Sequence, residues 1–425
     1  MFLEYVSVFF CILMILSGYR LERNFYNPLV MFFGVFGLMI LLSSLHLYNI
    51  FKTSQEVYSI IFIGLLSFTI GYFYFFFTKK KFYNENKVTT DTEVLNRKLV
   101  YIIYLLVIVF LLYRVIGVYQ LLSQGYTYSY LRINLNESLN VSPIVSLFNQ
   151  YFIKPMNFAL IPIGIIEYFT GAKKIIFLSI LVTILNMFIE GGRFTMMYFL
   201  VMFITMYLIQ KEEIYISNKV KRRLVILLVV GVILVIVMTN LRGVEYSIFK
   251  HLYLYIAGAI PHFEYRLAQL KDLDYYTYGI TSFRGFFLPI FLVLNELGIF
   301  SYPDILNNSM LITNSVNETV YIGTDNTFNS FVTIFHSFYL DGGILGVILG
   351  SLFYGIILSI TYNHLKTTSS KISTAIYLLL IQGIFTSMVR WQFTTPAYAL
   401  AFIFIFIFYK NRPVENTPLN KNLTS

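Results

Sequence analysis

Residues 175–209 read IIFLSILVTILNMFIEGGRFTMMYFLVMFITMYLI, two apolar runs on either side of a charged turn. Neither Ile175–Phe188 nor Phe194–Ile209 contains a charged residue. A helix crosses a bilayer in about 20 mostly apolar residues, with shorter runs at the limit, so both runs are predicted to be short membrane spans. The turn Glu190-Gly191-Gly192-Arg193 is predicted to lie outside the membrane between them.

The rest of the chain also alternates between apolar runs and short polar segments. Of its 425 residues, 57% are hydrophobic and 12% are charged, and the mean hydropathy is +0.71, which excludes an ordinary soluble domain. The sequence predicts an all-α polytopic membrane protein, one transmembrane helical domain over residues 1–425, with about eleven spans. The predicted spans are Phe2–Ser17, Leu29–Leu45, Val57–Phe77, Leu99–Tyr119, Ile144–Tyr168, Ile175–Phe188, Phe194–Ile209, Leu224–Thr239, Ile344–Tyr362, Thr374–Met388 and Ala397–Tyr409.

The positions of Lys and Arg predict the orientation of the spans. When the loop that contains Lys79–Lys81, Arg97 and Lys98 is placed in the cytoplasm, alternation puts most of the 31 basic residues on that side. The N-terminus is then outside and the C-terminus is cytoplasmic. The formal charge of +10 is explained by these inner residues rather than by nucleic-acid binding.

The N-terminal run shows no sign of processing. Met1–Ser17 has no basic region and no small-residue cleavage pattern, which indicates a first span rather than a removed signal peptide. The single cysteine, Cys11, lies in this run, and one cysteine excludes both a disulfide framework and a cysteine-ligated metal site.

One long external segment, residues 240–330, is expected within the domain. Its apolar runs, Leu252–Ile260 and Phe286–Phe300, are short and interrupted by Gly, Pro and polar residues. Such runs are more typical of interfacial or re-entrant helices than of spans. No internal repeat is visible, so the sequence does not favour an inverted-repeat transporter.

Two arginines at the outer ends of predicted spans are candidate phosphate ligands. Arg193 follows Gly191-Gly192, and Arg242 follows the span that ends at Thr239. Guanidinium groups bind phosphate oxygens in bidentate fashion and stay charged in partly dry surroundings. Simpler explanations stay open for both: a tight turn with an arginine that reaches lipid head groups, and an interfacial anchor.

The external segment also contains titratable side chains. Imidazole can transfer protons near neutral pH, so its histidines are candidate general bases, whereas most of the other charges are expected to be solvated. No HExxH-like spacing indicates a zinc site. The group consists of His251, His262, Glu264, Arg266, Asp272, Asp274 and Arg284.

A further group precedes the span at 344–362. Asp341 is either the N-cap of that span or a catalytic carboxylate. Gly342, Gly346 and Gly350 recur every four residues, a spacing that permits close helix packing. The candidates in this group are His336, Tyr339 and Asp341.

Two other segments are weaker candidates. Trp391, the only tryptophan, lies in Arg390-Trp391-Gln392 between the last two spans, where an interfacial aromatic belt would explain it. The first outer loop could stack on sugar rings through Tyr126, Tyr128, Tyr130 and Arg132. The cytoplasmic loops contain no Walker A, GxGxxG, GxSxG or DxD motif, so any chemistry is expected to face outward and to use a substrate that is already activated.

The chain resembles the O-antigen and capsular polysaccharide repeat-unit polymerases of the Wzy type. The general layout is similar over nearly the whole length, although Asp341-Gly342-Gly343 replaces a commoner Asp-aromatic-Gly pattern. The resemblance is carried by Gly191-Gly192-Arg193, Tyr276-Thr277-Tyr278-Gly279-Ile280-Thr281, and Thr327-Phe328-Asn329 through Tyr339-Leu340-Asp341-Gly342-Gly343-Ile344-Leu345-Gly346.

The resemblance implies a multi-pass C-type glycosyltransferase of the bacterial cytoplasmic (inner) membrane. Its donor and acceptor would be undecaprenyl-pyrophosphate-linked oligosaccharides, used without a metal or other cofactor, and a chain-length regulator and a flippase would be possible partners. Arg193 and Arg242 would hold the pyrophosphate. The base would be one of His251, His262, His336 and Asp341, and glycan would contact Arg266, Arg284, Tyr278 and Tyr339.

Three other functions remain open at this point. An O-antigen ligase uses the same donor with another acceptor. A lipid-linked oligosaccharide flippase or other transporter would place charges along a central cavity. A non-enzymatic scaffold for envelope assembly would tolerate replacement of the outer arginines.

Overall fold

The structure, a computed structural model, is mostly helical. It describes residues 2–83, 92–139, 141–192, 194–213, 248–273, 275–368 and 370–412, with isolated positions between 222 and 237. Within these residues, seven helices are long and apolar enough to cross a membrane: Phe2–Glu22 (α1), Gln55–Thr78 of α3 (Gln55–Tyr83), Arg97–Ser123 (α4), Pro143–Thr170, Phe194–Lys211 of α9 (Phe194–Glu213), Thr333–Thr368 (α15) and Lys371–Met388. This is the helix content of a multi-pass membrane protein.

Shorter helices complete the bundle. Two short apolar helices are Pro28–Ser44 (α2) and Pro396–Phe408 (α17), and Lys174–Glu190 (α8) has 17 residues. The run 143–170 comprises α6 (Pro143–Phe148), η2 (Asn149–Ile153) and α7 (Lys154–Thr170), and 371–388 comprises α16 (Lys371–Phe385) and η3 (Thr386–Met388). The predicted spans coincide with these helices, except Leu224–Thr239, most of which lies outside the described residues.

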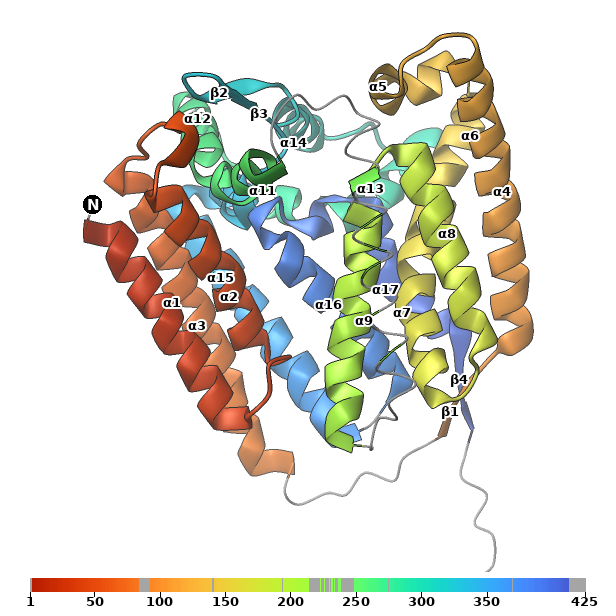
Figure 1. The fold of residues 1–425 in the computed structure, drawn as a ribbon, viewed down its shortest axis with the longest axis horizontal. Helices are drawn as coiled ribbons and strands as arrows, with labels where there is room; N and C mark the ends of the chain where they lie inside the picture. Colours follow the sequence, from red (N-terminus) through yellow and green to blue (C-terminus); the bar gives the residue numbers. More distant parts are fainter. Residues whose placement is uncertain are drawn as a thin grey trace, which may run out of the picture.

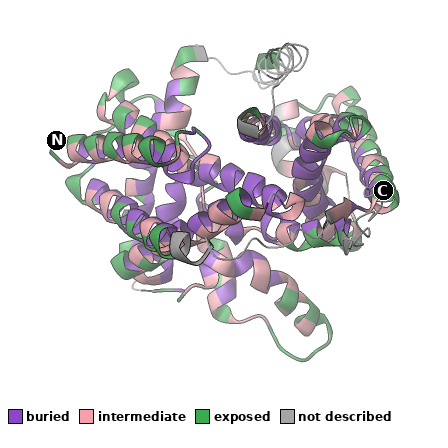
Figure 2. Cartoon of the chain, turned by 90° about the horizontal axis from the view of Figure 1, so that it is seen from below, coloured by how far each residue is buried: buried purple, intermediate pink, exposed green. Residues whose placement is uncertain are grey.

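Burial separates central from peripheral helices. Helices α1 and α4 are the least covered candidate spans, with 22% and 28% of their apolar windows buried, and α6–α7 and α16 are the most covered, with 72% and 67%. Viewed from below, buried residues gather in the centre and exposed ones at the rim (Figure 2). Because the exposed side chains of α1 and α4 are largely apolar, these helices present the faces expected to contact lipid.

Helices α3 and α15 pack backbone to backbone. A Cβ on Gly71 would lie 2.2 Å from the carbonyl oxygen of Leu352, and one on Gly355 would lie 2.3 Å from that of Phe68. Glycine at both positions therefore permits this close approach, as small residues do in membrane helix pairs.

Helix α15 bends sharply at Gly342 and Gly343. Gly343 has φ +58°, in the left-handed region that favours glycine. The bend brings Phe338 against Gly346, where a Cβ would lie 2.1 Å from the Phe338 carbonyl oxygen, and against Gly350. Close packing is thus present at Gly346 and Gly350, against the first part of the same helix, but not at Gly342, where no atom lies within 4 Å of the Cβ position. The bend sets the segment 333–341 apart from the apolar helix that follows.

Residues 248–328 form a cap of helices and one hairpin over one end of the bundle (Figure 1). The break expected within Leu252–Ile260 falls at Gly258, between two helices, and the second expected segment starts earlier, at Ile280. The cap consists of α11 (Ile248–Ala257), α12 (Ala259–Asp272), α13 (Ile280–Glu296), α14 (Asp304–Ser315) and the antiparallel pair β2 (Val320–Gly323) and β3 (Asn326–Phe328). After the orientation that the Lys and Arg positions predict, we call this segment the outer cap and this end of the bundle the outer end.

The outer cap is attached to the ends of α2 and α3. Ile50 forms an antiparallel bridge with Gly323. The Tyr253 hydroxyl donates to the Leu42 carbonyl oxygen at 2.7 Å and accepts from the Leu47 amide at 2.9 Å. These contacts fix the position of the cap helices relative to the spans.

The opposite end, which we call the inner end, carries a small ribbon. Strand β1 (Thr92–Leu95) pairs antiparallel with β4 (Tyr409–Arg412), so the segment before α4 is joined to the segment after α17. The ribbon lies at the bottom of Figure 1, far from the outer cap.

Candidate functional site

The two predicted pyrophosphate ligands, Arg193 and Arg242, lie outside the described residues, as does Asp274. Their pairing therefore remains a prediction. The other predicted site residues are described, and most of them lie at the outer end, on the cap helices or at the start of α15.

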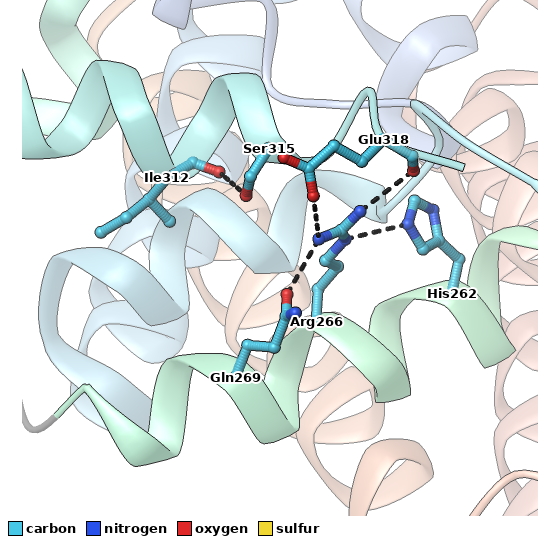
Figure 3. Close-up of polar contacts among 6 residues, drawn as sticks. All are labelled: His262, Arg266, Gln269, Ile312, Ser315 and Glu318. Atoms are coloured by element: carbon cyan, nitrogen blue, oxygen red, sulfur yellow. Dashed lines mark hydrogen bonds and ion pairs between the residues drawn. The ribbon is translucent and has the colours of Figure 1, made fainter. Parts of the chain in front are cut away.

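His262 and Arg266 form one buried cluster on successive turns of α12 (Figure 3). The imidazole Nδ1 lies 2.9 Å from the Phe331 carbonyl oxygen, and Arg266 Nε donates to His262 Nε2 at 3.1 Å. An imidazole that accepts at Nε2 and faces a carbonyl at Nδ1 is a neutral ring with its proton on Nδ1.

Burial explains the protonation state of His262. Desolvation, with a smaller contribution from the Arg266 charge, lowers the pKa of His262 from 6.5 to about 4, while the bond to Phe331 opposes this shift. Both ring nitrogens are engaged, and the ring is fully buried. His262 therefore lacks the free lone pair that a general base needs.

Arg266 is held by the protein itself. Its Nη1 donates to Gln269 Oε1 at 2.9 Å and its Nη2 to the carbonyl oxygen of Glu318 at 3.0 Å. The Glu318 carboxylate is 71% exposed and 3.8 Å away, so it adds little to the main-chain contact. Arg266 links α12 to the segment before β2, and this buried role does not fit the predicted contact with glycan.

The other two histidines are placed differently. His336 is buried at the start of α15 within electrostatic range of His262 and Arg266, and within the described residues no group forms a hydrogen bond with its ring. His251 is half-buried on α11, with its ring 4.6 Å from that of Tyr255.

Asp341 caps a helix that is not its own. Its carboxylate accepts hydrogen bonds from the Thr277 hydroxyl at 2.6 Å and from the amides of Thr281 and Ser282, both at 3.0 Å. These amides belong to the first turn of α13, where a negative charge is stabilised by the helix dipole. The prediction that Asp341 is the N-cap of the span that follows it is therefore wrong, because its carboxylate accepts from the first turn of α13 instead.

The two predicted glycan-binding tyrosines differ in exposure. Tyr278 is 81% exposed and sits with φ +50° in the turn before α13, whereas Tyr339 is buried. Only Tyr278 is placed to contact a ligand from solvent. In the first outer loop, the rings of Tyr126 and Tyr130 stack at 5.6 Å with both side chains exposed.

Arg284 joins the outer cap to the segment before α17. Its Nε donates to the Thr394 carbonyl oxygen at 3.2 Å and its Nη1 to the Ser309 carbonyl oxygen at 2.9 Å. Burial, and to a lesser extent the charge of Arg390, lower the pKa of Arg284 from 12.5 to about 10. Arg284 therefore stays charged at neutral pH, and Arg390 lies within electrostatic range of it.

The prediction that Trp391 lies in an interfacial belt is wrong. Trp391 is 3% exposed, and its indole Nε1 donates to the Ser282 carbonyl oxygen at 2.8 Å. Its ring packs edge-on against Tyr354 at 4.8 Å and Phe338 at 5.0 Å. The indole is part of the core because it fills the space between α13 and the bent helix α15.

Arg390, beside this tryptophan, is the functional candidate that the sequence marked only weakly. Its side chain is half-buried, and its pKa is lowered by burial. Within the part of the chain that the structure describes, no carboxylate lies within 4 Å of its guanidinium and no group accepts a hydrogen bond from it. The signal in the sequence was an arginine between two spans, which carries no information about its partners.

A carboxylate lies on the same side of the bundle. Glu190, at the end of α8, forms an ion pair of 2.8 Å with Lys154, and both side chains are partly exposed. The Tyr198 hydroxyl is within electrostatic range of both Arg390 and Glu190. We call Arg284, Arg390, Lys154 and Glu190 the outer cation site.

Among the described residues, no group of three His, Cys, Asp or Glu is placed to hold a metal ion. Comparison of the chain with protein-family models, curated proteins and solved structures finds no match.

Proposed function

We propose that this protein is a glycosyltransferase that polymerises undecaprenyl-pyrophosphate-linked oligosaccharide repeat units at the outer face of the bacterial cytoplasmic membrane. The resemblance of the sequence motifs to the Wzy-type polymerases motivates the proposal. The observation that carries it is the guanidinium of Arg390, half-buried at the outer end, with no counter-ion among the described residues and a second cation, Arg284, nearby.

Two neighbouring cations in partly dry surroundings call for an anion. Arg284 donates to the neutral carbonyl oxygens of Thr394 and Ser309, and no carboxylate of the described residues lies within 4 Å of Arg390, so neither charge is neutralised and the two guanidinium groups repel one another. A diphosphate carries enough negative charge to neutralise both groups and has the oxygen geometry that guanidinium binds best. Donor pyrophosphate would therefore bind at the outer cation site.

The adjoining turn supports this location. Helix α8 ends at Glu190, and Gly191 has φ +58°, a conformation that favours glycine. Arg193 follows two residues later in the sequence and would supply a further guanidinium, as the resemblance implies.

The chemistry requires a base and a stabilised leaving group. The acceptor sugar hydroxyl attacks the anomeric carbon of the donor, the bond from that carbon to the pyrophosphate oxygen breaks, and undecaprenyl pyrophosphate leaves with the electron pair. Arg390 and Arg284 stabilise the charge that develops on this leaving group. Glu190 accepts the hydroxyl proton through its second carboxylate oxygen, since only Oε1 pairs with Lys154 and the side chain is partly exposed. His262 and Asp341 are less suitable, because both ring nitrogens of the first and both oxygens of the second are engaged in hydrogen bonds.

The test uses the full chain in lipid nanodiscs and lipid-linked repeat units extracted from a strain that lacks this gene. Polymer length and released undecaprenyl pyrophosphate are measured together. Arg390→Gln is expected to reduce turnover roughly 100-fold, the effect of removing one charge-stabilising donor. Arg390→Lys is expected to recover only part of it, since an ammonium does not bind in bidentate fashion.

Arg20→Gln is the matched control, because Arg20 is an exposed arginine on α1 that carries the same charge change. It is expected to retain full turnover. Polymer of normal length from Arg390→Gln would contradict the assignment of the site. Repeat units that cross the bilayer without release of pyrophosphate would favour a transporter, and transfer only to a second, non-repeat acceptor would favour a ligase.

A further inference from the structure

A second charged site lies at the inner end, far from the outer cation site. It is a cavity of about 490 Å³ between the β1–β4 ribbon, the start of α4, the end of α7 and the start of α16. Four cations and two carboxylates line it: Arg97, Lys98, Lys371, Lys410, Glu93 and Glu167.

The two carboxylates are already satisfied by the protein. Glu93 accepts from the Ser370 hydroxyl at 2.6 Å and from the Ile372 amide at 2.9 Å, which ties the ribbon to the start of α16. Glu167, which is 3% exposed, pairs with Lys371 at 2.7 Å. Lys371 neutralises Glu167, whereas the neutral donors fix the position of Glu93 and leave its charge, so the four cations and two carboxylates give the cavity a net formal charge of +2.

The other three cations have no such partners. Arg97, Lys98 and Lys410 are exposed, and no carboxylate of the described residues lies within 4 Å of any of them. They surround a concave site rather than a flat surface, so their fields add within it. The cavity thus selects an anion with several oxygen acceptors.

The face of α4 above the cavity favours an anion with an apolar tail. Lys98, Ile102, Leu105 and Val109 follow one another at intervals of three or four residues and share one face of the helix. The last three side chains are exposed, on a helix that is among the least covered of the candidate spans. An acyl chain would lie along this stripe while its phosphate enters the cavity.

We propose that the inner-end cavity binds the head group of an anionic phospholipid through Arg97, Lys98 and Lys410, with the acyl chains along α4. Basic pockets between membrane helices recognise lipid phosphates in this way. The bound lipid links β1, β4 and α4, and so holds the last span, α17, to the rest of the bundle. The site does not depend on the proposed transferase activity.

The test measures lipid binding to the purified full chain in neutral detergent by native mass spectrometry. Wild-type protein is titrated with phosphatidylglycerol, with zwitterionic phosphatidylcholine and with soluble glycerol 3-phosphate. Phosphatidylglycerol is expected to bind at least tenfold more tightly than phosphatidylcholine. Glycerol 3-phosphate is expected to compete poorly, because it lacks the acyl chains.

The variant Arg97→Gln/Lys98→Gln/Lys410→Gln is expected to lose this tenfold preference. Its matched control is Arg20→Gln/Lys173→Gln/Lys174→Gln, which removes the same charge from exposed positions outside the cavity and is expected to keep the preference. If the first triple variant does not fold, the single variant Lys98→Gln is tested in its place. It is expected to reduce the preference for phosphatidylglycerol over phosphatidylcholine at least threefold.

An unchanged preference in the triple variant, or in Lys98→Gln where that variant decides, would overturn the proposal. Equal binding of phosphatidylcholine by the wild type would also overturn it, since the cations would then select nothing. Full competition by glycerol 3-phosphate at equal concentration would assign the cavity to a soluble phosphate instead of a lipid.

Discussion

The carboxylate of Asp341 accepts a 2.6 Å hydrogen bond from the hydroxyl of Thr277, a residue 64 positions earlier in the chain. This contact, together with the amides at the start of α13, joins the bend of α15 to the outer cap. Both carboxylate oxygens of Asp341 accept hydrogen bonds from the protein, so neither is free to contact a substrate.

Asp341→Asn is expected to destabilise the protein by about 3 kcal/mol, because a buried amide nitrogen would then face a backbone donor. Thermal unfolding of the purified protein measures the loss, and the exposed Asp272→Asn serves as the control. Turnover per folded molecule is expected to be unchanged. A variant of normal stability with abolished turnover would instead assign Asp341 to the chemistry.

Substitution by alanine is expected to affect stability differently at the neighbouring residues Gly342 and Gly343. Gly343→Ala is expected to cost about 1 to 2 kcal/mol, because φ is +58° and the new Cβ would lie 2.9 Å from the Tyr276 hydroxyl. Gly342→Ala is expected to be nearly neutral, since φ is −178° and no atom lies within 4 Å of its Cβ position. The unfolding temperatures of the two variants are measured and compared with that of the wild type. Equal decreases in the two variants would contradict the backbone conformation described for the bend.

His262 predicts a pH dependence of stability. Its pKa falls from 6.5 in the unfolded chain to about 4 in the fold, so the unfolded state binds more protons as the pH drops through this window. The stability that neutral His262 contributes is therefore present above pH 6.5 and is lost as the pH falls towards 4, by about 3 kcal/mol in all.

The difference in unfolding free energy between wild type and His262→Gln measures this effect. It is expected to shrink between pH 7 and pH 4.5, because glutamine does not titrate. His46→Gln, in the segment between α2 and α3, controls for general acid effects. A difference that is constant with pH would show that His262 is not held in its neutral form.

Trp391 provides a spectroscopic check, since it is the only tryptophan in the chain. A buried indole is expected to emit at short wavelength and to resist quenching by aqueous iodide and by brominated lipids alike. Denaturation is expected to shift the emission to longer wavelength. Strong quenching by brominated lipids would place the ring at the membrane interface, which the core position excludes.

The helices were largely predictable from the sequence because each is specified by its own residues. A run of about 20 apolar residues must satisfy its backbone hydrogen bonds internally if it lies in lipid, so hydropathy alone located α1, α3, α4 and α9. The glycines of α15 were likewise informative, since a residue without a side chain permits a bend or a close contact wherever it occurs.

The roles of the polar residues were not predictable in this way. His262, Arg266 and Asp341 were all candidates for chemistry, yet each is held by hydrogen bonds to the protein. Trp391 and Arg390 are neighbours in sequence, but one is in the core and the other lacks a partner among the described residues. The residue type shows which chemistry a side chain is able to perform, but it does not show which groups surround that side chain in the fold.

The sequence by itself determined that the chain is helical, apolar and suited to cross a membrane many times, because these properties follow from local composition. Only the tertiary structure decided which charged groups are engaged and which are open to a ligand. The partners of Trp391 and His262 lie 109 and 69 residues away along the chain. Contacts over such separations exist only once the helices have packed, and burial then sets whether a charge is neutralised, paired or left for a substrate.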